Sequence, residues 1–148
     1  MSPELFDPSR FGLENARQTK LSDCYGLGMV VYEVLSGHIP FHQYSTVVVV
    51  RHVLKGQRPE RPRGPEGARF TDDVWGVLER CWAQQPSERP SIMNVLQYFE
   101  EVSKSWTPPP PQMEADAWES SCSLTKLVKY LLSFSIHLST EAFPAFPS

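Results

Sequence analysis

The chain has 148 residues, a hydrophobic fraction of 41% and a formal net charge of −3. This length suits about one globular domain, and the charge balance argues against a nucleic-acid partner held through phosphate contacts. The cysteines Cys24, Cys81 and Cys122 are odd in number and far apart, so we expect neither a disulfide framework nor a zinc site. No secretory signal and no apolar run of ~18 residues occurs, so we expect no membrane span. These features together predict an intracellular protein, cytoplasmic or nuclear.

Helices dominate the predicted structure of the first 106 residues. A helix is expected from an N-cap at Ser22 to Leu35, with Gly37 as its stop. It is apolar on nearly every side, which is typical of a helix at the centre of a fold. A second helix is predicted from Ser45 to Leu54, although its four consecutive valines also favour a strand.

A loop, two further helices and a tail follow. The loop Gln57 to Arg69 is rich in proline, and its basic part at 58–63 is interpreted as a solvated face, with contact to phosphopeptides or acidic partners as the alternative. The next helix is predicted from Asp72 to Gln84, and Ser91 is expected to cap the last one, which runs to about Lys104.

Four consecutive prolines at 108–111 mark a domain boundary, because proline continues neither a helix nor a sheet ladder. We therefore predict a folded unit at 1–106, a Pro-rich and acidic linker at 107–119, and a largely unstructured tail at 120–148. An apolar stripe at 124–138 indicates a possible amphipathic helix in that tail. It could pack on the folded unit, on a partner or on a membrane surface, and its two lysines make the membrane the weaker alternative.

Four short motifs resemble, in the same order, the C-terminal lobe of protein kinases. Ser2-Pro3-Glu4 resembles the Ala-Pro-Glu motif that closes the activation segment. The pattern Asp23-x-Tyr25-Gly26-x-Gly28 resembles the opening of the lobe's central helix, and Gly37-x-x-Pro40-Phe41 the turn after it. Cys81-Trp82-x-x-x-Pro86-x-x-Arg89-Pro90-Ser91 resembles the segment before the last helix in tyrosine kinases and tyrosine-kinase-like kinases.

The resemblance covers residues 1 to about 104 and implies structural roles for several of them. It implies a buried ion pair between Glu4 and Arg89 that ties the activation segment to the lobe. It implies that Asp23 braces the catalytic loop, and glycine at position 28 lets the central helix approach its neighbour closely. The fold expected is mainly α: the C-terminal helical subdomain of a protein-kinase-like fold, truncated before the catalytic loop.

The parts that perform phosphoryl transfer in kinases do not occur in these 148 residues. A glycine-rich loop, a β3 lysine, a His-Arg-Asp loop and an Asp-Phe-Gly metal site are all missing. The four histidines form no metal-binding pattern. We therefore assign no catalytic, cofactor-binding or metal-binding residue, and expect ATP and Mg²⁺ to belong to the full family domain only.

Three hypotheses follow for the function. The chain is a kinase fragment that is inactive alone, either a degenerate copy or an incomplete gene model whose Met1 is an internal methionine. Alternatively it is a non-enzymatic protein-binding module that uses the docking face of the lobe, because apolar surface left uncovered needs a partner. Thirdly, the tail helix anchors the chain to a membrane or a partner.

Overall fold

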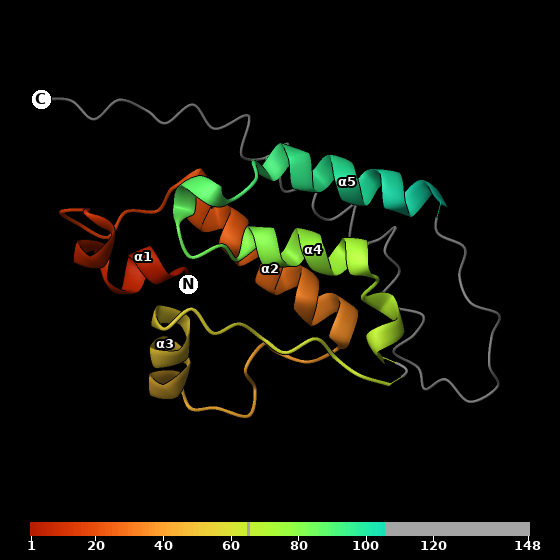
Figure 1. Cartoon of the computed structure of the whole chain (residues 1–148), viewed down its shortest axis with the longest axis horizontal. Coiled ribbons are helices and arrows are strands. Elements are labelled where there is room, and N and C mark those ends of the chain that lie inside the picture. Colours follow the sequence, from red (N-terminus) through yellow and green to blue (C-terminus); the bar gives the residue numbers. More distant parts are fainter. Residues whose placement is uncertain (65, 106–148) are drawn as a thin grey trace, which may run out of the picture. The chain divides into compact units, whose positions relative to one another are not determined.

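The computed structural model describes residues 1–64 and 66–105, and these residues form helices and turns without any strand (Figure 1). The expected mainly α fold is confirmed. By internal contacts the chain divides into two units, Met1–Val95 and Leu96–Ser148. The predicted linker at 107–119 and the tail helix at 124–138 lie outside the described residues. No helix in the described part is both long enough and apolar enough to cross a membrane.

Helix α2, Lys20–Ser36, begins three residues before the start that an N-cap at Ser22 predicts. Its N-cap is Thr19, whose hydroxyl accepts from the Ser22 backbone N–H at 3.2 Å, while the Ser22 hydroxyl accepts from the Thr19 N–H at 2.8 Å. The prediction of Ser22 as the N-cap is therefore wrong, because Ser22 is the third residue of a capping box. The predicted stop is confirmed: Gly37 has φ 73°, a left-handed conformation that glycine adopts without strain.

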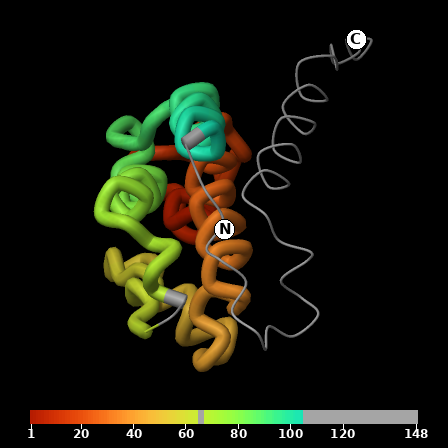
Figure 2. Tube along the Cα trace, turned by 90° about the vertical axis from the view of Figure 1, so that its right-hand side faces the viewer, coloured from red at the N-terminus to blue at the C-terminus, as the bar shows by residue number. Residues whose placement is uncertain are grey.

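Helix α2 is buried along one side and partly open along another. Cys24, Tyr25, Val31 and Leu35 are buried, whereas Val30 is 47% exposed. The prediction of a helix buried all round is thus wrong on the side that carries Val30. The buried side packs against helix α4, Asp72–Cys81, and the two run side by side in both views (Figures 1 and 2).

The N-terminal elements pack on helix α3. Helix α1 spans Pro3–Phe6, the 3-10 helix η1 spans Pro8–Phe11, and α3 spans Thr46–Leu54 with Ser45 as its N-cap. Contacts join α1 to α3, and the Arg10 guanidinium donates to the Leu54 carbonyl at 3.0 Å. The valine run is helical, as predicted. Helix α3 buries Val53 on one side and exposes Val47 to solvent.

Helix α4 ends three residues earlier than predicted. The 3-10 helix η2, Glu66–Arg69, precedes α4, and the 3-10 helix η3, Pro86–Glu88, follows it. Trp82 is the C-cap of α4 and lies outside the helix. Trp82 leaves the helix because its buried ring joins a group of aromatic side chains whose neighbouring centroids are 5.5–6.0 Å apart: Tyr32, Phe70, Trp75 and Trp82.

Helix α5, Ile92–Ser105, crosses the boundary between the two units. The predicted cap is confirmed, since the Ser91 hydroxyl accepts from the Asn94 N–H at 3.2 Å. Within the second unit, Leu96 and Phe99 are buried, and Lys104 pairs with Glu100 at 3.2 Å along the helix.

Candidate functional site

A buried ion pair joins the two ends of the first unit. The Arg89 guanidinium donates to both oxygens of the Glu4 carboxylate, at 2.7 and 2.8 Å, and the two residues are only 5% and 2% exposed. Arg89 also donates to the backbone carbonyls of Leu21 and Ala83, at 2.9 and 3.0 Å. One side chain therefore connects α1, the first turn of α2 and the segment after α4, and the expected ion pair is present.

The pair sits beside an aromatic ring and is shielded from water. Burial raises the pKa of the Glu4 carboxyl and is the largest single influence on it. The hydrogen bonds and the positive charge of Arg89, together with hydrogen bonds from the Glu4 backbone and Ser2, outweigh burial and hold the pKa below the usual 4.5. The guanidinium carbons of Arg89 and Arg58 lie 5.0 and 5.2 Å from the centre of the Tyr25 ring. Burial raises the pKa of Tyr25 to about 12, because the phenolate would be desolvated.

Asp23 lies apart from this network. It is in the first turn of α2, where a carboxylate favours the helix dipole, and it is exposed. Within the described part of the chain its carboxylate accepts no hydrogen bond. Its expected role as a brace for a catalytic loop stays a prediction, because no such loop is among these residues.

At Gly28, α2 lies very close to the end of α4. A Cβ atom there would lie 2.6 Å from Trp82 Nε1 and 2.9 Å from Cys81 Cβ. Real Cβ atoms do not come this close to their neighbours, so the contact requires glycine. The two buried thiols, Cys24 and Cys81, belong to the same two helices.

The remaining motif residues shape turns. Ser2 and Pro3 are buried at the start of α1, Pro86 opens η3, and Pro90 precedes the cap of α5. Pro40 belongs to the turn after α2, where Phe41 takes a φ of 62° that is rare for a residue with a side chain. The motifs thus provide scaffold contacts, and the described residues include no group of three or more His, Cys, Asp or Glu placed to hold a metal ion.

The basic part of the loop was predicted to be a solvated face, and this prediction is wrong for Arg58. This side chain is only partly exposed and donates to the carbonyls of Trp82, Val53 and Gln57 and to the Gln84 side chain. Sequence reasoning also missed a pocket of about 370 Å³ beside α3, to which Arg58 contributes. The available signal was the density of aromatic and histidine side chains at 38–52.

Comparison with known proteins agrees with the motifs. Residues 1–99 match the family model described as protein tyrosine and serine/threonine kinase. The proto-oncogene tyrosine-protein kinase ROS of Rattus norvegicus is 39% identical over 89 residues, which are 57% of this chain and 4% of that protein. The serine/threonine-protein kinase VIK of Arabidopsis thaliana is 28% identical over 106 residues, which are 71% of this chain and 22% of that protein.

The match extends to bacteria but not to solved structures. The serine/threonine-protein kinase PkaA of Streptomyces coelicolor is 33% identical over 91 residues, which are 62% of this chain and 16% of that protein. No solved structure matches the chain. The chain spans only a small part of the curated relatives it matches, but the family model covers well over half of it. The chain therefore belongs to the protein tyrosine and serine/threonine kinase family.

Proposed function

We propose that this chain is a protein-binding module built from the helical lobe of a kinase, and that the 148 residues alone do not transfer phosphate. ATP and Mg²⁺ belong, on this proposal, to the full family domain, and nucleic acid and membrane are not its partners. Buried, unpaired thiols at Cys24 and Cys81 support a reducing, intracellular location.

The observation that carries the proposal is the exposure of three apolar side chains in the segment 39–47, which also contributes residues to the pocket. Within residues 39–47, Ile39 is 64% exposed, Tyr44 42% and Val47 73%. They occupy the turn after α2 and the first turn of α3. Several exposed apolar side chains in one short segment are typical of a surface that a protein partner covers.

An unbiased selection tests the binding function. Peptides from a random displayed library are selected on the purified full chain, and the selected peptides are measured against a variant with Ile39→Ser, Tyr44→Ser and Val47→Ser. We expect binding to be lost in this variant. It should persist in a control with Leu13→Ser and Val30→Ser, which are also exposed. Failure to enrich any peptide, or equal loss in both variants, would contradict the proposal.

The absence of activity is tested separately. We expect the purified chain to transfer no phosphate from ATP and Mg²⁺ to a mixed protein substrate above a control without enzyme. The support is the missing catalytic loop and metal site in the 148 residues. Turnover above that control, abolished by removal of Mg²⁺, would overturn this half of the proposal.

A second candidate function is suggested by the small share of its relatives that the chain spans, 4% in rat ROS. In a longer polypeptide that also carried the catalytic motifs, the same surface would serve an active ATP-dependent protein kinase. The transcript upstream of Met1 distinguishes the two candidates: in-frame His-Arg-Asp and Asp-Phe-Gly codons would establish the longer kinase, and an in-frame stop codon would exclude it.

A further inference from the structure

The pocket beside α3 has mixed walls, in which aromatic rings alternate with polar and charged side chains. It lies between α2, the turn after it, α3 and the extended segment at 57–60. Rings of Tyr32, Phe41, Tyr44 and His52 line it, and the centroids of Tyr44 and His52 are 4.7 Å apart in an edge-to-face arrangement. A volume of about 370 Å³, bounded on part of its surface by these rings, accommodates one aromatic or branched side chain of a partner.

A positive charge contributes to the same walls. Arg58 lines the pocket, and its guanidinium has five N–H donors, four of which are used by acceptors of this chain. Those acceptors are three carbonyls and one amide, so within the described residues Arg58 is hydrogen-bonded but not matched by a carboxylate. Among the described residues, one N–H on Nη2 has no acceptor.

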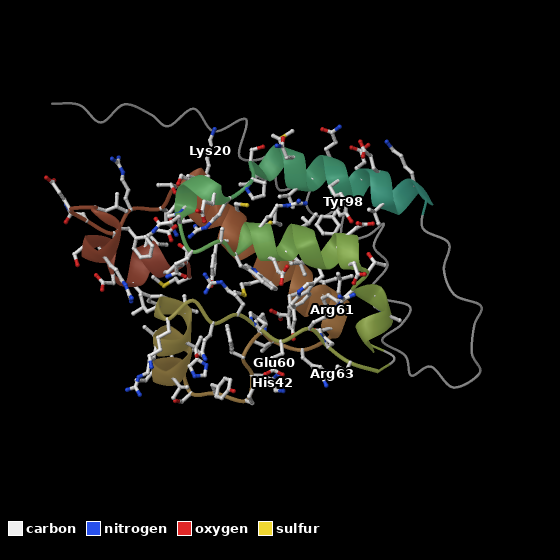
Figure 3. The ribbon with its side chains drawn as sticks, viewed as in Figure 1. Lys20, His42, Glu60, Arg61, Arg63 and Tyr98 are labelled. Atoms are coloured by element: carbon white, nitrogen blue, oxygen red, sulfur yellow. The ribbon has the colours of Figure 1, made fainter. Side chains whose placement is uncertain are left out.

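The sequence around the pocket is basic although the whole chain is acidic. From residue 37 to residue 63 there is one acidic side chain, Glu60, and there are five basic ones: Arg51, Lys55, Arg58, Arg61 and Arg63. Figure 3 shows Glu60, His42 and Arg63 on the lower side of the view, far from Lys20 on α2 near its top, and both Glu60 and His42 line the pocket. Arg61 pairs with Asp72 at 2.7 Å, an exposed contact that solvent screens.

We propose that the pocket receives an acidic protein segment, in which an aromatic or branched side chain enters between the rings and flanking carboxylates meet the basic residues around it. This inference rests on the proposed binding function and names its partner class. Charge gives the encounter its rate and orientation, and the apolar side chain gives the complex its lifetime.

Three short matched peptides test the partner class by fluorescence anisotropy on the full chain. The first has a central Trp flanked by Glu and Asp, the second replaces its acidic residues with Lys, and the third replaces its Trp with Ala. We expect the first to bind, the third to bind about tenfold more weakly, and the second not to bind. Added salt should weaken the first, because the charges meet at an exposed rim.

Two charge reversals locate the contact. Lys55→Glu, at the end of α3, should weaken the acidic peptide by about tenfold, whereas Lys20→Glu makes the same change in net charge at a distant exposed position and should leave it unchanged. Both positions are exposed, so circular dichroism should confirm an intact fold in each variant. Tyr44→Ser tests the ring wall with Val30→Ser as its control.

The outcomes separate this inference from the function on which it rests. Equal binding of the acidic and basic peptides, or equal weakening by Lys55→Glu and Lys20→Glu, overturns the acidic partner. Enrichment of neutral or basic peptides in the random library, lost in the Ile39, Tyr44 and Val47 variant, also overturns it but supports the binding function. Heparin and the peptide lacking Trp can also be tested as competitors of the acidic peptide that contains Trp. If both displace it equally well, the surface binds polyanions in general and the proposal is overturned.

Discussion

Among single residues, Glu4 offers the sharpest test of how the first unit is held together. Glu4→Gln keeps the size of the side chain but leaves the Arg89 charge buried without a counter-charge. We expect the free energy of unfolding to fall by ~3–5 kcal/mol, as measured by urea denaturation followed by circular dichroism. Glu88→Gln removes an exposed carboxylate of η3 and is the control. Similar losses in both variants would show that the ion pair is not the cause.

The same pair predicts a dependence on acid. The pKa of Glu4 is lower in the folded chain than its usual 4.5, so the contribution of the pair is fully present above that pH. It is lost as the pH falls through the folded pKa, because a proton then replaces the hydrogen bonds from Arg89. Between neutral pH and pH ~3 the free energy of unfolding should fall more steeply for the wild type than for Glu4→Gln. Parallel profiles would count against this assignment.

Tyr25 predicts the opposite dependence, at high pH. Its hydroxyl is buried and has no hydrogen-bond partner within the described residues, and its folded pKa is raised to about 12 from 10. A raised folded pKa gives stability that is present below pH 10 and lost as the pH rises toward 12. Tyr25→Phe should therefore be close to neutral at pH ~8 and should reduce the alkaline loss. Tyr44→Phe, at an exposed ring, should leave the alkaline profile of the wild type unchanged.

Between elements, α2 carries two glycines with opposite surroundings, and its contact with the end of α4 depends on Gly28. Alanine is favoured over glycine in a helix by ~1 kcal/mol, and nothing lies within 4 Å of a Cβ at Gly26. Gly26→Ala should therefore stabilise the chain. Gly28→Ala would push a Cβ into Cys81 and Trp82 and should destabilise it by ~1–3 kcal/mol in spite of the same propensity gain. Thermal unfolding of both variants gives the two signs, and stabilisation by Gly28→Ala would contradict the packing.

Elements with local signals were predictable from sequence, and contacts that depend on distant residues were less so. Gly37 and Ser91 end and begin helices through their own chemistry, so their roles were predicted correctly. Thr19 was missed because a capping box depends on a reciprocal partner three residues away. The end of α4 was misplaced because the packing of Trp82 on distant rings overrides helix propensity.

The candidate site likewise has parts that the sequence predicted and parts that it did not. The family motifs predicted the contact between Glu4 and Arg89, which lie 85 positions apart in the sequence. Hydrophobic periodicity alone does not predict a contact over such a separation. The pocket was not predicted, since its walls come from α2, a turn, α3 and an extended segment, and no local pattern specifies how they meet. Arg58 was predicted to lie on a solvated basic face, because the number of charged residues in a segment does not show which of them donates to backbone carbonyls in the folded chain.

For the whole molecule, the two buried thiols report whether the 148 residues fold by themselves. Cys24 and Cys81 have no exposed surface, and the neighbouring Cys24 thiol together with burial raises the pKa of Cys81. Thiol reagents attack the thiolate and need access, so both cysteines should react only through opening of the unit that contains α2 and α4.

Labelling of a Cys122→Ser variant with a maleimide, followed by mass spectrometry, measures this directly. We expect neither thiol to react in buffer over a time in which both react fully in urea. In a background that also carries Glu4→Gln, labelling should accelerate equally at the two positions, because they are buried in the same unit and the ion pair closes that unit. Rapid labelling without urea would mean that the isolated chain does not hold this fold. Acceleration at Cys24 alone would mean that the loss of the ion pair loosens the start of α2 without opening the contact between α2 and α4.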